Sequence, residues 1–153
     1  MKKLPFAALL LLFCLPTIAG RIVTDTVKSK ILSADVPCNV YLPDGFGNDK
    51  GQKYPVIYLL HGLSDDYRAW RDKGQMQTVV DELISSGECL PVVIIMPNAG
   101  GSDVHNIWNG YFNMPGWSYE DFFFQEFIPH IDKTFRTIAS KEGRAIAGLS
   151  MGG

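Results

Sequence analysis

The sequence has 153 residues, of which 46% are hydrophobic and 20% are charged. This composition is typical of a globular domain with one hydrophobic core, and it excludes a disordered chain. The formal net charge of −2 at pH 7 excludes the basic field that nucleic acid binding requires. The sequence contains no Cys/His cluster with zinc spacing, and we expect neither a metal nor a cofactor.

Residues 1–19 are predicted to form a secretory signal peptide. Two lysines near the N-terminus precede an apolar run, residues 4–15, which has the length of a signal-peptide core and is too short to span a bilayer. Small residues at the end of this segment favour cleavage after Ala19, with cleavage after Gly20 as the alternative. We therefore expect a secreted or periplasmic protein without stable membrane insertion after cleavage, whose domain occupies residues 20–153.

Three cysteines bear on export and on disulfide formation. Cys14 would permit a lipoprotein anchor, but Phe13 before it is bulkier than the small residue that lipid attachment needs, so we do not expect an anchor. Cys38 and Cys89 remain in the exported chain, where an oxidising compartment allows one disulfide between them. The sequence leaves open that disulfide and a pair of buried free thiols, of which we favour the free thiols.

The exported chain is expected to begin with two strands. Residues 22–28 alternate between apolar and polar side chains, as a half-buried strand does, and residues 37–42 form a second candidate strand. The second strand ends at Pro43-Asp44-Gly45, a turn signal in which proline presets φ and glycine permits a positive φ.

Three later apolar runs indicate a parallel sheet with crossover helices. Val56–Leu60 and Val92–Met96 are continuous and rich in β-branched residues, which is typical of strands buried on both faces, and Ala145–Leu149 is a weaker case. Gln75–Ser86 and Ser118–Phe135, which separate these runs, carry apolar residues at helical spacing. This order predicts an α/β fold, a mainly parallel sheet with helices on both faces.

The ends of both helices can be predicted from the sequence. Gly87 follows the first helix as a C-terminal stop. The second opens with Ser118 and Asp121 at the spacing of a capping box, and we expect a kink near Pro129. The apolar stripe of this second helix is expected at Phe122, Gln125, Phe127, Ile128, Ile131 and Phe135.

The segment Gly148-Leu149-Ser150-Met151-Gly152 fits the pattern G-x-S-x-G directly after the last apolar run. A serine on a tight turn from strand to helix exposes its hydroxyl in a strained conformation, and the flanking glycines let the chain pass close to itself. The pattern therefore predicts Ser150 as a catalytic nucleophile. A glycine-rich turn without chemistry is the plainer alternative, whereas a phosphate-binding P-loop is excluded because no Gly-Lys-Ser/Thr follows.

The segment His61-Gly62-Leu63 directly follows the apolar run Val56–Leu60. In α/β-hydrolases a turn at this place supplies one backbone N–H of the oxyanion hole, and the residue after the nucleophile supplies the other. Two donors aimed at the oxyanion lower the reaction barrier by several kcal/mol. Both halves occur here in the expected order, which strengthens the prediction of a nucleophile.

Four segments resemble the putative-esterase family of α/β-hydrolases, which includes secreted feruloyl and acetyl-xylan esterases, S-formylglutathione hydrolases and mycolyl-transferring antigens. These segments are Tyr54–Trp70, Val92–Ser102, Tyr119–Phe135 and Arg144–Gly153, and the resemblance covers nearly all of the chain from about residue 36 onward. It implies that Ser150 is the nucleophile and that Leu63 and Met151 present the oxyanion N–H groups. The two motifs are completed by His61, Gly62, Gly148 and Gly152.

The family order of catalytic residues is nucleophile, then acid, then histidine. The chain ends three residues after Ser150, so we expect the acid and the histidine beyond it and interpret residues 20–153 as the N-terminal part of one esterase domain, truncated after the nucleophile turn. The strand before Ser150 would then be an unpaired edge, and we expect the chain alone to fold poorly and to be inactive. The resemblance makes His61 part of the oxyanion turn and not the general base.

A long loop, residues 98–117, holds several amide and aromatic side chains, among them Tyr111 and Trp117. Loops of this length in a compact domain are usually functional, and His105 and Trp108 are candidate substrate-binding residues. The alternative is that the aromatic side chains only pack the loop against the domain.

Export and the resemblance together imply a secreted serine carboxylesterase. Its substrates would be acyl esters on plant polysaccharides or related carbohydrates, hydrolysed through an acyl-enzyme on Ser150. Three alternatives stay open: an acyltransferase on the same scaffold, a thioesterase like S-formylglutathione hydrolase, and a catalytically dead fragment or binding domain. The expected partner is the ester substrate and not a nucleic acid, and the sequence leaves the oligomeric state open.

Overall fold

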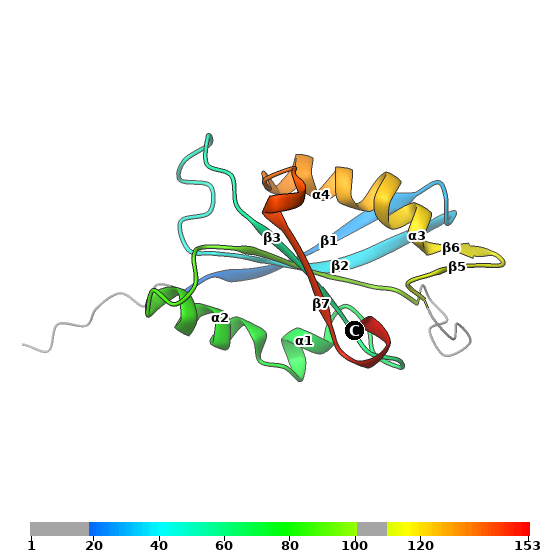
Figure 1. Ribbon diagram of the computed structural model, residues 1–153, viewed down its shortest axis with the longest axis horizontal. Helices are drawn as coiled ribbons and strands as arrows, with labels where there is room; N and C mark the ends of the chain where they lie inside the picture. The colour runs from blue at the N-terminus through cyan, green and yellow to red at the C-terminus, as the bar shows by residue number, and fades with distance from the viewer. Residues whose placement is uncertain (1–18, 101–109) are drawn as a thin grey trace, which may run out of the picture.

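A computed structural model describes residues 19–100 and 110–153 of the chain (Figure 1). Five strands form the main sheet in the order β1-β2-β4-β3-β7, and β5 and β6 form a two-stranded ribbon. The strands are β1 (Arg21–Ser29), β2 (Ala34–Leu42), β3 (Val56–Leu60), β4 (Val93–Pro97), β5 (Asn113–Met114), β6 (Trp117–Ser118) and β7 (Arg144–Gly148). The helices are α1 (Ala69–Asp72), α2 (Met76–Ser85), α3 (Tyr119–Phe122), the π-helix η1 (Phe123–Phe127), α4 (Ile128–Phe135) and the 3-10 helices η2 (Lys141–Gly143) and η3 (Ser150–Gly152).

The strands expected from the sequence are all present, with small shifts at their ends. The three apolar runs become β3, β4 and β7, which run parallel to one another as predicted. β1 and β2 form an antiparallel hairpin, and β2 is also antiparallel to β4. The turn after β2 forms as expected, since Phe46 N–H donates to the Pro43 carbonyl oxygen at 3.1 Å and Gly45 has a φ of 73°.

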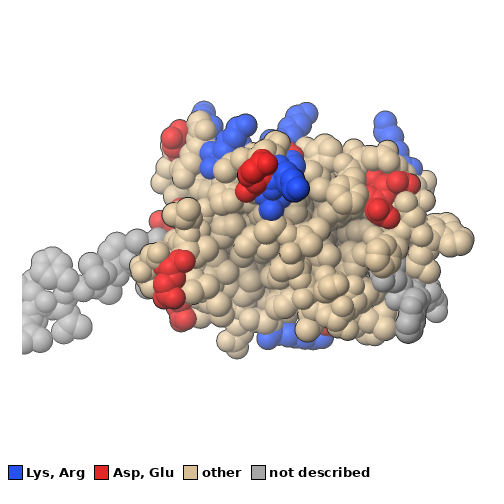
Figure 2. All heavy atoms as spheres, viewed as in Figure 1, with Lys and Arg blue, Asp and Glu red and all other residues tan. Residues whose placement is uncertain are grey.

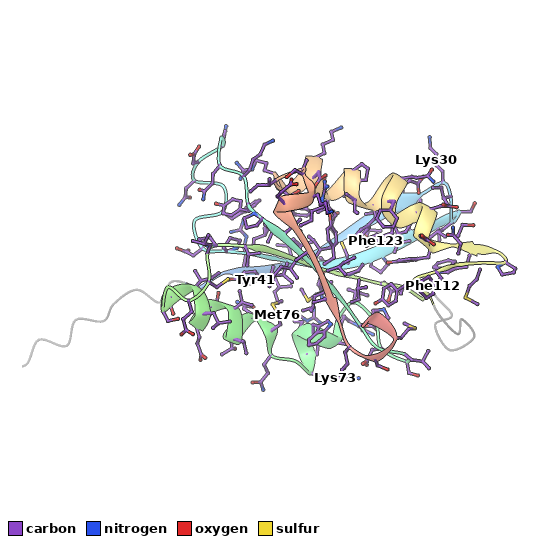
Figure 3. The ribbon with its side chains drawn as sticks, in the orientation of Figure 1. Lys30, Tyr41, Lys73, Met76, Phe112 and Phe123 are labelled. Carbon is purple, nitrogen blue, oxygen red and sulfur yellow. The ribbon has the colours of Figure 1, made fainter. Side chains whose placement is uncertain are left out.

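Helices cover both faces of the sheet, as the α/β prediction requires (Figure 1). α1 and α2 lie on one face, where Met76 of α2 packs with Tyr41 of β2 and Ile94 of β4 in the smaller core (Figure 3). The helical segment from α3 to α4 lies on the other face, over the larger core. Successive residues of β3 and β4 contribute to the two cores in turn, because neighbouring side chains of a strand point to opposite faces.

The helical segment over the larger core differs from the sequence prediction. Phe122, Phe123 and Phe127 are buried, whereas Gln125, which helical spacing places in the apolar stripe, is exposed. The π-helix η1 explains the difference, because its wider turn brings two adjacent phenylalanines onto the core side. The backbone therefore departs from α-helical geometry before Pro129, which lies in the first turn of α4.

The predicted capping box at the start of this segment is wrong. The Ser118 side chain makes no capping hydrogen bond, and the backbone N–H of Asp121 donates to Oδ1 of Asn113 at 3.1 Å instead. Asn113 belongs to β5, so the two-stranded ribbon, which the sequence did not indicate, supplies the cap. The start of the helix is thus tied to the loop that leads into it.

β7 lies at one edge of the sheet, and much of its apolar surface is accessible. Ile146 in β7 is 59% exposed, Leu149 directly after it is 57% exposed, and Phe124 of η1 is 59% exposed. Charged side chains are sparse over the middle of the face seen in Figure 2, where Figure 1 places β7. The unpaired edge expected from the sequence is present in the structure, and the poor folding of the chain alone stays a prediction.

Cys38 and Cys89 are free thiols on opposite faces of the sheet. Cys38 is buried in the larger core, and Cys89 is half-buried against the smaller core under α2. The sheet separates the two sulfur atoms, which confirms the free-thiol alternative, although only Cys38 is buried as expected. Within the described residues no helix is long and apolar enough to cross a membrane, and the predicted signal peptide lies almost wholly outside them.

Candidate active site

Ser150 stands at the turn between β7 and the 3-10 helix η3. It is exposed, and its backbone has a φ of 55°, a left-handed conformation that costs a non-glycine residue roughly 1–2 kcal/mol. β3 supports the turn from the side, because Gly148 pairs with Leu60 and the N–H of Leu149 donates to the Leu60 carbonyl oxygen at 3.3 Å. The turn therefore has the strained backbone and the exposed serine that the pattern G-x-S-x-G predicts.

Close packing explains the two glycines of this motif. A side chain at Gly148 would overlap the carbonyl group of Gly152, and a Cβ at Gly152 would lie 2.6 Å from the Cβ of Leu60. Carbon atoms in a protein interior do not approach so closely. A larger residue at either position would therefore shift the backbone that carries Ser150.

Gly62 brings the second motif to the same place. A Cβ at Gly62 would lie 3.6 Å from the Cβ of Ser150 and 3.4 Å from the carbonyl oxygen of Leu149. β3 and β7 are adjacent and parallel, so the residues that follow the two strands arrive at the same edge of the sheet. The structure thus brings together the two motifs that the sequence predicts to form one site.

The His61 imidazole is held inside the turn. The residue is 2% exposed. Nδ1 of His61 lies 2.8 Å from the carbonyl oxygen of Gly62, and Nε2 accepts the backbone N–H of Ala99 at 3.1 Å. Burial lowers the pKa of His61, and the neutral ring with its proton on Nδ1 is the form that satisfies both contacts. Because both ring nitrogens are engaged, His61 is not free to act as a general base.

Tyr111 holds the backbone of His61, a role that sequence reasoning missed. The Tyr111 hydroxyl oxygen accepts the N–H of His61 at 2.7 Å, and the hydroxyl donates to the His61 carbonyl oxygen at 3.1 Å. Burial raises the pKa of Tyr111, so the hydroxyl keeps the proton that it donates. The only signal in the sequence was the place of Tyr111 among the aromatic residues of the loop, which does not indicate a partner.

The remaining predicted site residues are Leu63, Met151, His105 and Trp108. Leu63 is 44% exposed, and Met151 packs at the margin of the larger core. That the backbone N–H groups of Leu63 and Met151 donate to the oxyanion stays a prediction. His105 and Trp108 lie outside the described residues. In the described part of the loop, Trp117 Nε1 donates to the carbonyl oxygen of Ala99 at 3.0 Å, as the packing alternative expects.

His130 lies in α4 and contacts β1, the edge strand opposite β7. Its Nε2 lies 2.7 Å from Oδ2 of Asp25 in β1, and β1 and β7 are the two opposite edge strands. Neither His61 nor His130 is therefore placed to take a proton from Ser150. In residues 19–100 and 110–153, no group of three or more His, Cys, Asp or Glu side chains could hold a metal ion.

Two cavities border the site on the two faces of the sheet. The one on the larger-core face has a volume of about 170 Å³ and is lined mainly by aromatic rings, including those of Tyr111, Phe112 and Phe123 (Figure 3). The one on the opposite face has a volume of about 210 Å³, and its lining includes Gly62 and Lys73. The first suits an apolar or aromatic group, whereas the second is bordered by charge.

Comparison with known protein sequences relates the chain to esterases. The family model described as "Putative esterase" matches residues 29–153. The chain is 39% identical over 137 residues to an endo-1,4-beta-xylanase/feruloyl esterase of Xylanibacter ruminicola, a match that covers 88% of this chain and 19% of that protein.

Two solved structures share the fold. A ferulic acid esterase matches with a TM-score of 0.83 and 48% identity, over 88% of this chain and 51% of its own. The feruloyl esterase module from Clostridium thermocellum, a serine-to-alanine mutant complexed with sinapinate, matches with a TM-score of 0.69 and 28% identity, over 90% of this chain and 47% of its own. The chain thus spans about half the length of these solved chains and a smaller share of the Xylanibacter protein.

Proposed function

Because the chain belongs to the putative esterase family and has the α/β-hydrolase fold, we propose that its protein hydrolyses carboxylic esters with Ser150 as the nucleophile. The observation that carries this proposal is the backbone of Ser150, an exposed serine with a φ of 55° directly after β7. The turn that contains Gly62 runs beside this serine, as an oxyanion hole requires.

The proposed reaction is acyl transfer through a covalent intermediate. A general base takes the proton of the Ser150 hydroxyl, the oxygen attacks the ester carbonyl, and the N–H groups of Leu63 and Met151 stabilise the oxyanion. The alcohol leaves with the proton returned by the base, and water then releases the acid by the same sequence of steps. The order of the triad in this fold predicts the acid and the histidine C-terminal to Ser150, in keeping with the engagement of His61 in the turn.

We further propose that the substrate is a hydroxycinnamoyl ester of a plant polysaccharide. The names of the similar proteins support this choice, since they include feruloyl and ferulic acid esterases and a complex with sinapinate. The aromatic cavity of about 170 Å³ beside Tyr111 and Phe112 offers apolar surface for an aromatic acyl group. The signal peptide predicted for residues 1–19 would deliver the enzyme to the periplasm or the medium, where it would meet polymeric substrates.

Substitution of the nucleophile tests the proposal in the protein produced from its complete gene. Ser150→Ala is expected to lower kcat for methyl ferulate at least about 10⁴-fold, because the acyl-enzyme cannot form. Ser33→Ala is a matched control, since Ser33 has a similar φ of 52° but lies in the turn between β1 and β2. Activity that survives in a folded Ser150→Ala variant would refute the nucleophile.

The products of the same assay distinguish hydrolysis from acyl transfer. A hydrolase releases ferulate at a rate that an added sugar acceptor leaves unchanged, because water is the acceptor. A transferase forms a new sugar ester, and release of the free acid falls as the acceptor is added. Detection of that ester as the main product by mass spectrometry would replace hydrolase with acyltransferase and leave Ser150 in its role.

A further inference from the structure

A small site formed by α2 and β2 holds the backbone directly before β1. The backbone N–H of Gly20 donates to Oδ1 of Asp81 at 2.8 Å, and the side-chain amide of Gln77 donates to the Gly20 carbonyl oxygen at 2.8 Å. The same oxygen of Asp81 accepts the hydroxyl of Tyr41 at 2.6 Å. Two side chains therefore hold the Gly20 backbone, and Tyr41 holds the carboxylate of one of them.

Gly20 fits this site because it has no side chain. A Cβ at this position would lie 2.5 Å from Cε2 of Tyr41 and 2.6 Å from the carbonyl oxygen of Leu42. Tyr41 is fully buried on the side of the sheet that faces α2 (Figure 3), and the second close contact, the Leu42 oxygen, belongs to the backbone of β2. Burial and the hydrogen bond to Asp81 raise the pKa of Tyr41, which therefore remains a donor to the carboxylate.

We propose that Asp81, Gln77 and Tyr41 form a receptor for a new N-terminus created at Gly20 during export. A signal peptidase would hydrolyse the bond between Ala19 and Gly20 with water, which leaves a carboxylate on Ala19 and an amino group on Gly20. This α-amino group is largely protonated at neutral pH, so the hydrogen bond to Asp81 becomes a charge-assisted ion pair. The inference rests on the predicted signal peptide and is independent of the esterase activity.

The site also distinguishes between the two cleavage points that the sequence leaves open. Cleavage after Gly20 would remove the residue that fits against Tyr41 and would begin the chain at Arg21, the first residue of β1. Cleavage after Ala19 keeps the glycine and places its charge on Asp81. Among the described strands β1 is an edge strand that pairs with β2 alone, so the ion pair would attach this edge to α2 once the leader is gone.

The test uses the exported protein produced from its complete gene. Mass spectrometry of the N-terminal peptide is expected to identify Gly20 as the first residue. Selective acetylation of the α-amino group and Asp81→Asn are each expected to lower Tm by about 2 °C. Acetylation of the Asp81→Asn variant is expected to cause no further loss, because the ion pair is already absent. Glu82→Gln removes an exposed carboxylate at the next position of α2 and is expected to leave the effect of acetylation unchanged.

The outcomes separate this site from the proposed catalysis. An exported protein that begins at any residue other than Gly20 would overturn the proposal. An acetylation effect of equal size with and without Asp81 would also overturn it, because the charge would then act elsewhere. Neither readout involves ester hydrolysis, so failure here leaves the assignment of Ser150 intact, and failure of Ser150→Ala leaves this site intact.

Discussion

His61 is the residue on which the contacts of the turn after β3 converge. Its ring accepts the N–H of Ala99 and contacts the Gly62 carbonyl oxygen, and its backbone is held on both sides by the Tyr111 hydroxyl. Protonation would turn Nε2 into a donor that faces another donor. The contacts therefore favour the neutral ring, which links the turn to Ala99.

Removal of the Tyr111 hydroxyl is expected to impair turnover more than binding. Tyr111→Phe leaves the N–H and the carbonyl oxygen of His61 without their shared partner, so the turn beside Ser150 loosens, and kcat should fall roughly tenfold with KM little changed. Steady-state kinetics with methyl ferulate measures both. Tyr119→Phe is the matched control, because the buried hydroxyl of Tyr119 has no hydrogen-bond partner among the described residues. Equal losses in the two variants would contradict the role of Tyr111.

The depressed pKa of His61 predicts a loss of stability in acid. The unfolded chain takes up a proton near the ordinary value of 6.5, which the buried native ring does not. Stability from this group is complete above about pH 6.5 and falls at lower pH, by at most about 1.4 kcal/mol per pH unit. Denaturant unfolding at several pH values between about pH 5 and pH 8 measures this change in the free energy of unfolding. His61→Gln, which does not titrate, should lack this component, and identical pH profiles would refute it.

At the scale of elements, the pairing of β3 with β7 builds the site. Both strands run in the same direction, so the turns that follow them, with Gly62 after β3 and Ser150 after β7, meet at one edge. The turn between β7 and η3, here called the elbow, depends on two glycines, Gly148 and Gly152, that have backbone or side-chain atoms packed against them. The π-helix η1 is a case in which local spacing fails. Its wider turn changes which phenylalanines face the core, so α-helical spacing wrongly places Gln125 in the apolar stripe.

A methyl group at the first glycine of the elbow is expected to disrupt both stability and activity. Gly148→Ala forces its Cβ into the Gly152 carbonyl group, which should cost about 2–3 kcal/mol and most of the turnover because Ser150 shifts. Gly87→Ala provides the comparison, since Gly87 has a φ of 78° and open space around it, so only about 1 kcal/mol of strain is expected, with kcat unchanged. Chemical unfolding and ferulate assays on both variants test this, and an active, stable Gly148→Ala protein would contradict the close contact.

At the scale of the whole molecule, one sheet separates two cores. β4 lies between β2 and β3, although it follows both in the chain. α2 packs over one core, and α3 to α4 pack over the other. The edge at β7 leaves apolar side chains such as Ile146 accessible. Exposed apolar surface on an unpaired strand favours association, which is the physical basis for expecting residues 20–153 alone to fold poorly.

The separation of the cores predicts different reactivity for the two cysteines. Burial raises the pKa of Cys38 to about 12, so the native protein holds almost no reactive thiolate there. Cys89 is half-buried and should be alkylated by iodoacetamide without unfolding, whereas Cys38 should react only in denaturant. Peptide mass spectrometry of labelled native and unfolded protein distinguishes them. A disulfide-linked pair of these peptides, or equal labelling in the native state, would contradict the structure.

Local patterns predicted most of the strands and helices and the two motifs of the candidate site. Continuous apolar runs identified β3 and β4, because strands buried on both faces need such residues, and the glycine pattern around Ser150 located the elbow. The failures have physical causes. The capping box at Ser118 was displaced by a side chain from β5, and the stripe through Gln125 assumed a regular helical turn where the backbone widens.

By itself, the sequence determined the succession of strands and helices and the glycines that the tight turn at Ser150 needs. It also determined the order of the two motifs, His61-Gly62-Leu63 before Gly148–Gly152. These features depend on residues near one another in the chain, where hydrophobic period and backbone preference act directly. Only the tertiary structure decided the order of strands in the sheet, the hydrogen bonds of Tyr111 to the His61 backbone and the hydrogen bond of Gly20 to Asp81. Those contacts join residues 50 and 61 positions apart, and they exist only because sheet order and helix placement bring distant segments into contact.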